Sequence, residues 1–280
     1  MQTRTHTDRP AAAPRWRLGA SARRLTFLAA TLALVAIGCG GDEQSLSGPP
    51  VGEPILPDLV PEAPDTLHTR RDAQGNWTMR FSSTIVNVGD GDFILHGDRT
   101  GDQWAVEQQI AYTDSGSELV PTAATMVFGG DGHDHWHVER VATYRLEAVD
   151  VSGVPLAGAE GRADTKVGFC FYDSHKKLDG GPGKAQFSRH SCGEQSDTQF
   201  SVGLSPSWGD VYDFTLPGQS VNITDLSDGR YRLWAEADPQ AWFREVTRDN
   251  NLTWIDFELT TQAADGTRRA AVVATGPRPG

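Results

Sequence analysis

Short segments in which apolar and polar residues alternate dominate the chain after its first 55 residues. Tyr231, Leu233 and Ala235 alternate with residues that include Arg232 and Glu236, which is the two-residue period of a half-buried β-strand. The pattern predicts eight strands: 78–88, 92–95, 124–128, 136–148, 167–172, 220–223, 231–237 and 252–259. No long amphipathic helix is predicted after residue 38. Glycine and proline number 30 and 16, which suits many turns. We therefore expect an all-β fold, an antiparallel β-sandwich with long loops.

The first residues have the pattern of an export signal. Arginines precede an apolar run over 25–37, which is shorter than the roughly 20 residues that a membrane-spanning helix needs. The run ends at Cys39 in a sequence that resembles a bacterial lipobox, so we expect lipidation of Cys39, with an ordinary cleavable signal as the alternative. The Arg23-Arg24 pair is a weak indication of twin-arginine export, and an ordinary charged region at the start of a signal peptide is the preferred interpretation. The predicted organisation is a signal peptide over 1–38, a flexible tether over 39–54, one domain over 55–262 and a tail over 263–280.

This organisation predicts an exported lipoprotein of the bacterial cell envelope, with its domain in the periplasm or on the cell surface. The tail is expected to form an edge strand or to be disordered. Once Cys39 is set aside, Cys170 and Cys192 are the remaining cysteines. Two cysteines in an exported chain suggest one disulfide, and two buried free thiols are the alternative.

The formal net charge is −12, and residues 1–38 carry six arginines and one aspartate, so the chain from Cys39 onward carries −17. Such a charge repels nucleic acid and anionic lipid and attracts cationic partners, although simple solubility is the commoner reason for it. We therefore expect no nucleic-acid partner, and contact with a membrane only through the lipid anchor.

Three of the eight histidines, His133, His135 and His137, fall within five residues. On a single strand, side chains two residues apart share one face and lie roughly 7 Å apart. Three imidazoles so arranged can converge on one metal ion, and imidazole suits copper, zinc, iron and nickel. A surface histidine cluster without metal is the alternative.

Two further segments carry groups that are ambiguous by themselves. Lys166 stands in a strand-like run, where a solvated lysine is the ordinary interpretation. The chain has four lysines and otherwise uses arginine. Tyr212 follows the sequence Gly203-Leu204-Ser205-Pro206, and a core or turn tyrosine is the ordinary interpretation there.

Taken in order, these segments resemble the catalytic domain of the lysyl oxidase family over nearly the whole chain after the signal. The match follows the family's order of motifs. It comprises the opening 56–61, the strand and turn around Phe81 and Asp92, the alternating histidines, the Lys166 segment with Phe169-Cys170, the Tyr212 segment and the closing 249–251. The departures are fewer possible disulfides and a different, lengthened stretch over 175–199, which is expected to border the Lys166 and Tyr212 region and to alter substrate access.

The resemblance implies copper(II) bound by His133, His135 and His137, with zinc less favoured. It also implies a lysine tyrosylquinone cofactor formed from Lys166 and Tyr212. An arginine could not replace Lys166, because its guanidinium stays protonated. The implied reaction converts primary amines of proteins, peptides or polyamines to aldehydes, ammonia and hydrogen peroxide. Asp210 is the candidate general base, with a turn residue as an equal alternative.

Two rival functions remain open at this point. The first is a non-catalytic copper-binding β-sandwich of the envelope, which needs the histidines but no quinone. The second is a zinc hydrolase, in which three histidines leave an open position on the metal. That second rival gives no role to Lys166 or Tyr212.

Overall fold

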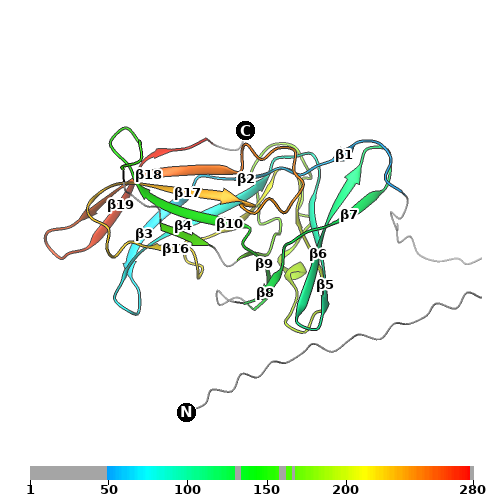
Figure 1. The fold of residues 1–280 in the computed structure, drawn as a ribbon, viewed down its shortest axis with the longest axis horizontal. Coiled ribbons are helices and arrows are strands. Elements are labelled where there is room, and N and C mark those ends of the chain that lie inside the picture. Colours follow the sequence, from blue (N-terminus) through cyan, green and yellow to red (C-terminus); the bar gives the residue numbers. More distant parts are fainter. Residues whose placement is uncertain (1–48, 130–133, 158–161, 166–167, 278–280) are drawn as a thin grey trace, which may run out of the picture. The chain divides into compact units, whose positions relative to one another are not determined.

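Antiparallel strands make up nearly all the regular structure that the computed structural model describes, which covers residues 49–129, 134–157, 162–165 and 168–277. Within those residues the helical structure is one short 3-10 helix, η1 (Arg189–Cys192). These residues belong to one compact unit, Ser45–Gly280. The predicted all-β class is therefore confirmed (Figure 1).

Two of the sheets pack against each other as the layers of a sandwich. The first has the order β13-β15-β4-β16, with β2 and β3 also paired to β4. Its strands are β2 (Leu59–Pro61), β3 (Asp65–Arg71), β4 (Trp77–Asn87), β13 (His175–Lys176), β15 (Trp208–Tyr212) and β16 (Ser220–Asn222). The second has the order β11-β10-β17-β18-β19. Its strands are β10 (Ala142–Ala148), β11 (Arg162–Thr165), β17 (Gly229–Ala237), β18 (Leu252–Thr261) and β19 (Arg268–Thr275).

The core between these two sheets is made of the apolar residues that alternate along their strands. Phe81 of β4 and Tyr144 of β10 meet edge to face, with ring centroids 4.8 Å apart. The Tyr144 hydroxyl donates a hydrogen bond to Ser83 Oγ at 2.6 Å, which satisfies its polar end inside the core. Burying each such aromatic ring stabilises the fold by about 2 kcal/mol.

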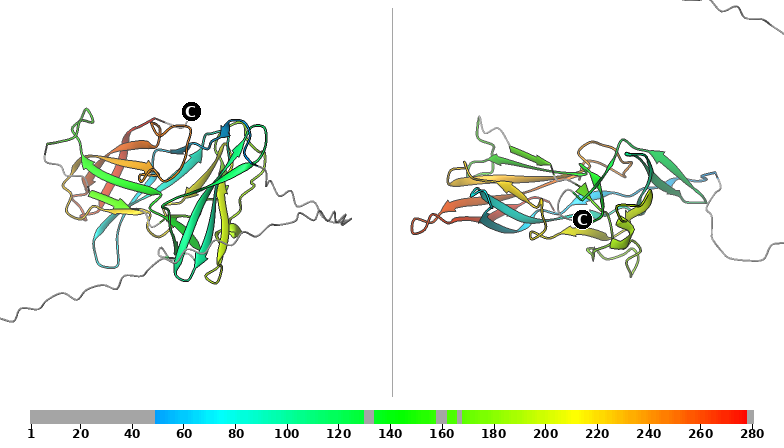
Figure 2. Two further views of the ribbon diagram at one scale, coloured as in Figure 1. Left: turned by 45° about the vertical axis from the view of Figure 1, so that its right-hand side comes forward. Right: turned by 90° about the horizontal axis from the view of Figure 1, so that it is seen from below.

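A further sheet stands beside the sandwich, on the right of Figure 1 and in front in the left view of Figure 2. Its order is β1-β6-β5-β14, with β7 paired to β6. Its strands are β1 (Pro54–Ile55), β5 (Phe93–Thr100), β6 (Gln103–Tyr112), β7 (Ser117–Pro121) and β14 (Gln199–Leu204). A small sheet of order β12-β9-β8 packs on it. The ring centroids of Trp136 in β9 and Trp104 in β6 lie 4.8 Å apart. The strands of this small sheet are β8 (Met126–Phe128), β9 (Trp136–Glu139) and β12 (Gly168–Phe169).

The prediction of one strand over 136–148 is wrong. The chain forms β9 and β10 there, in different sheets, and Arg140 between them has a φ of 57°. This left-handed conformation turns the chain out of the small sheet and into the sandwich. The strand predicted over 167–172 is also shortened to β12. Of the two expectations for the tail, the edge strand is the one observed, because β19 pairs with β18.

The calls on the signal peptide, Cys39 and most of the tether fall within residues 1–48, which lie outside the described residues. Among the residues that are described, no helix is long and apolar enough to cross a membrane.

Candidate active site and metal centre

The described histidines of the cluster flank Trp136 at the beginning of β9. The expectation that all three lie on one strand is wrong in its bounds, because β9 begins at Trp136 and His135 lies in the bend before it. The backbone N–H of Gly129 donates to the carbonyl of His135 at 3.0 Å, so the loop between β8 and β9 closes there. His133 lies outside the described residues.

His135 and His137 nevertheless bring their rings together. The ring centroids are 4.5 Å apart and the planes are inclined by 40°. The side chain of His137 is completely buried. Two imidazoles this close offer nitrogen ligands that suit copper, and also zinc, iron and nickel. The described part of the cluster is therefore compatible with a copper site and contains two of the three predicted ligands.

The strand β12 lies directly beside His137. Its Gly168 pairs with Glu139 of β9. A Cβ atom added at Gly168 would come within 2.9 Å of the Cβ of His137 and 2.4 Å of the Val138 carbonyl oxygen. Only glycine permits this approach. Lys166, the predicted source of the cofactor amine, lies outside the described residues.

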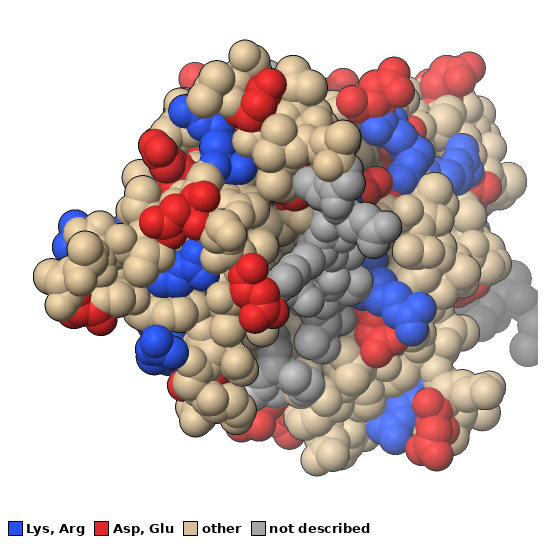
Figure 3. Space-filling view, turned by 60° about the vertical axis from the view of Figure 1, so that its left-hand side comes forward, with Lys and Arg blue, Asp and Glu red and all other residues tan. Residues whose placement is uncertain are grey.

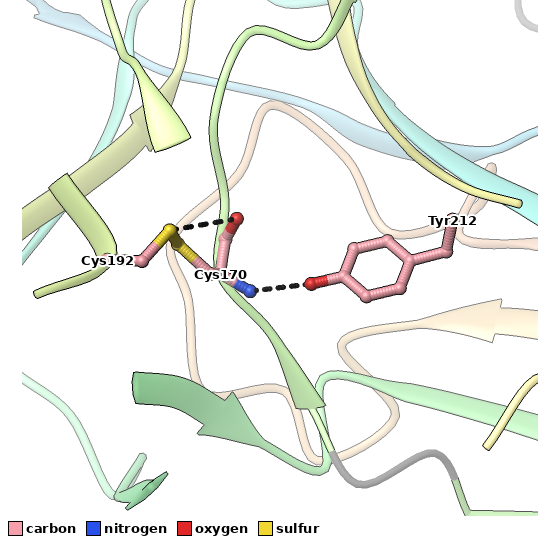
Figure 4. The surroundings of a disulfide bond; sticks show 3 residues. All are labelled: Cys170, Cys192 and Tyr212. Carbon is pink, nitrogen blue, oxygen red and sulfur yellow. Dashed lines mark hydrogen bonds between the residues drawn. A yellow bond between two sulfur atoms is a disulfide. The ribbon is translucent and has the colours of Figure 1, made fainter. Parts of the chain in front are cut away.

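Tyr212 is held from two sides at the end of β15. The backbone N–H of Cys170 donates a hydrogen bond to its hydroxyl oxygen at 3.0 Å, as Figure 4 shows. The ring of Phe169 lies 4.3 Å from the Tyr212 ring, inclined by 55°. Tyr212 is 3% exposed, so both its ring and its hydroxyl have defined positions.

Asp210 lies two residues before Tyr212 on the same strand and has no exposed surface. It is therefore a strand residue, and the alternative of a turn residue is wrong. Burial raises the pKa of Tyr172, and the negative charge of Asp210 raises it further. Burial also raises the pKa of Tyr144, with a smaller contribution from Asp210. Both hydroxyl groups therefore sense the charge of the Asp210 carboxylate.

A cavity of about 100 Å³ joins the two predicted halves of the site. The residues that line it come from four separate segments: His135, Tyr172, Arg189, Val211, Tyr212 and Leu216. The structure thus brings a predicted copper ligand and the predicted cofactor tyrosine to one space. Sequence analysis missed Tyr172, Arg189 and Leu216. Tyr172 belongs to the segment that begins with Phe169-Cys170, but nothing in the sequence marked Arg189 or Leu216.

The predicted disulfide between Cys170 and Cys192 is present, with 5.6 Å between the Cα atoms. A ring nitrogen of His135 and the two sulfur atoms lie within 4.8 Å of one another. These three residues do not form a metal site, because the sulfur ligand in proteins is a thiolate and not a disulfide. Their proximity instead shows that the disulfide packs beside the histidine pair.

Asp173 fastens the segment that leads to η1. Its carboxylate accepts hydrogen bonds from the backbone N–H groups of Gln186 and Phe187, at 2.8 and 3.2 Å. It also accepts from the backbone N–H and the hydroxyl of Ser205, both at 2.8 Å. Asp173 is buried, and it ties the loop before η1 to the turn that leads into β15.

Comparison with known proteins finds both a family and a relative. A family model described as lysyl oxidase matches residues 108–267, which is more than half of the chain and includes every predicted metal and cofactor residue. The protein-lysine 6-oxidase of Gallus gallus is 25% identical over 191 residues. Those residues are 68% of this chain and 36% of that protein, so the match spans about a third of that relative.

Proposed function

Because the chain belongs to the lysyl oxidase family, we propose that it is a copper-dependent amine oxidase. It converts primary amines, such as lysine side chains of proteins or peptides, or polyamines, to aldehydes with release of ammonia and hydrogen peroxide. The observation that carries the proposal is the shared cavity, which His135 and Tyr212 line together. A copper ligand and an oxidisable tyrosine at one space are what self-processing of a tyrosine requires.

The proposed ligands of copper(II) are His133, His135 and His137, whose imidazole nitrogens suit that ion. The proposed lysine tyrosylquinone derives from Lys166 and Tyr212. When bound, copper and the quinone supply the redox chemistry and an electrophilic carbonyl for the substrate amine.

The residues around the cavity have positioning and proton-transfer roles in this proposal. The N–H of Cys170 holds the Tyr212 oxygen, and the Phe169 ring limits rotation of the Tyr212 ring. Asp210 takes the proton from the carbon that bears the substrate amine. Asp210 is buried and lies two residues from Tyr212 on the same strand, which is the placement that supports this role for its carboxylate.

The test is copper loading of the purified chain, followed by the visible absorbance of a quinone, formation of a phenylhydrazine adduct and amine-dependent peroxide release. Lys166→Arg and Tyr212→Phe are each expected to abolish all three signals. Tyr231→Phe is the matched control, because Tyr231 is a buried tyrosine whose hydroxyl donates to the Ser227 carbonyl at 2.8 Å in another part of the fold.

Peroxide release that survives both substitutions would exclude the cofactor assignment. Copper binding without quinone or adduct would instead favour a non-catalytic copper-binding protein of the envelope. Zinc bound in preference to copper, together with hydrolytic activity, would favour a zinc hydrolase.

The proposed location is the bacterial cell envelope, with the domain exported and tied to a membrane by lipid on Cys39. The chain from Cys39 onward carries a formal charge of −17, so contact with anionic lipid headgroups or nucleic acid is disfavoured. Incorporation of labelled fatty acid into the expressed chain tests this. Cys39→Ser should abolish labelling and release the domain from the membrane fraction, whereas labelling that persists would place the lipid elsewhere.

A further inference from the structure

Arg189 brings a permanent positive charge to the cavity that contains Tyr212. A guanidinium remains protonated under all conditions relevant to a protein. Among the other residues that line the cavity, His135 is a proposed metal ligand and the rest are tyrosines or aliphatic side chains. The cavity that would receive a cationic amine substrate is therefore lined by a cationic side chain as well.

The segment that carries Arg189 is anchored on both sides. Two residues before it, the N–H of Phe187 donates to Asp173. Three residues after it, Cys192 is joined to Cys170 by the disulfide. Between these anchors, the N–H of Ser191 donates to the Ser188 carbonyl at 2.9 Å and closes the turn of η1. The backbone of Arg189 is thus held at the cavity.

The guanidinium still has donors to offer a ligand. Arg189 is exposed, and no hydrogen bond or ion pair joins it to another residue that the structure describes. Its charge nevertheless reaches the cavity, because it lowers the pKa of Tyr172 against the larger effects of burial and Asp210. A planar group with several N–H donors matches the two oxygens of a carboxylate.

We propose that Arg189 binds a carboxylate of the amine substrate, so that the enzyme selects primary amines that also carry a carboxylate over diamines and polyamines. The inference rests on the proposed amine oxidase function and narrows its substrate class. A second ammonium group near Arg189 would be repelled, whereas a carboxylate would be attracted. The net negative charge of the chain does not by itself select amines that carry a carboxylate over diamines and polyamines. On the face in Figure 3, acidic and basic side chains are interspersed instead of forming one acidic track.

The sharpest comparison uses two substrates with the same amine. N-acetyl-lysine carries a carboxylate, and N-acetyl-lysinamide carries a neutral amide in its place. For the copper-loaded enzyme, kcat/KM is expected to be about tenfold higher for the acid, the size of effect that one exposed charge-assisted contact provides. The peptides acetyl-Lys-Glu-amide and acetyl-Lys-Gln-amide, compared in the same way, show whether a neighbouring acidic side chain serves as well as a free carboxylate.

Arg189→Gln is expected to bring both kcat/KM ratios, acid over amide and Glu peptide over Gln peptide, close to one, and Arg189→Lys is expected to retain part of the preference. Arg189→Gln should also improve 1,5-diaminopentane relative to pentylamine. Arg269→Gln is the control, since Arg269 is an exposed arginine on the edge strand β19. A wild-type ratio of one, or a preference that survives Arg189→Gln, overturns the inference while the oxidase function stands.

Binding without copper separates this inference from the proposed function. Hexanoate should bind the copper-free protein in calorimetry or NMR titration, and Arg189→Gln should weaken that binding about tenfold. If no amine is oxidised but hexanoate binds through Arg189, the oxidase proposal fails and the carboxylate site stands. If hexanoate does not bind, or binds the variant equally well, the carboxylate site is wrong.

Discussion

The backbone N–H of Cys170 donates a hydrogen bond to the hydroxyl of Tyr212, although 42 residues separate them. Cys170 is also joined to Cys192, the last residue of η1. One residue therefore orients the proposed cofactor tyrosine and holds the segment that carries Arg189. The disulfide therefore positions residues of the proposed site and also stabilises the fold.

Loss of the disulfide should destabilise the protein and loosen the site together. Cys192→Ser opens a loop with a sequence separation of 22, which costs about 3 kcal/mol of unfolding free energy in the chain-entropy model. Urea unfolding of the wild type with and without reductant, beside the variant, measures this. Equal midpoints in all three samples would contradict it. The reductant should leave the midpoint of the variant unchanged, which is the internal control.

Asp210→Asn should lower kcat for amine oxidation by roughly 100-fold or more, as loss of a general base does. Copper content and the quinone absorbance should remain, because the side chain keeps its size and Tyr212 keeps its hydrogen bond to Cys170. Asp213→Asn, an exposed position three residues further along, serves as the control and should leave kcat nearly unchanged. If Asp210→Asn retains full kcat, the base is another group.

His137→Gln should weaken copper binding more than the roughly 10- to 100-fold that outer-sphere substitutions cost. His137 is completely buried, and its ring lies 4.5 Å from that of His135. Copper content after dialysis against a competing chelator measures the loss. The control is His175→Gln, at an exposed position in β13. Equal copper retention in His137→Gln and the wild type would remove His137 from the metal site.

Glu245 should make the stability depend on pH. Burial raises the pKa of Glu245 to about 7, against hydrogen bonds from Asn251 and the Leu59 N–H that lower it. In the unfolded chain its pKa is about 4.3. The raised folded value means that its stabilising contribution is complete below the unfolded pKa and is lost as the pH rises through about 7.

The difference in unfolding free energy between wild type and Glu245→Gln should therefore change by about 3 kcal/mol between pH 4 and pH 8. The unfolding free energy of the wild type should fall relative to that of the variant as the pH rises. Urea unfolding in buffer that contains a chelator measures it. Glu258→Gln is the control, at an exposed position on β18. Parallel pH profiles for Glu245→Gln and the wild type would contradict a raised pKa in the folded state.

The strands that sequence analysis located well are rich in buried residues, on alternate positions in β17 and on consecutive positions in β4. Predictions over 78–88, 231–237 and 252–259 agree with β4, β17 and β18 within a few residues. Strands such as β3 and β19 were missed as definite predictions because most of their residues are exposed, which removes the apolar alternation. The break at Arg140 was missed because a left-handed backbone conformation leaves no mark when the residue is not glycine.

By itself, the sequence determined the all-β class, the candidate disulfide and the histidines, lysine and tyrosine worth testing. Each of these depends on residue type or local spacing, which a chain carries before it folds. The tertiary structure alone decided that His135, Tyr212 and Arg189 line one cavity, and that Cys170 holds Tyr212. Such contacts join segments tens of residues apart, and only the pairing of sheets and the closure of loops brings them within reach.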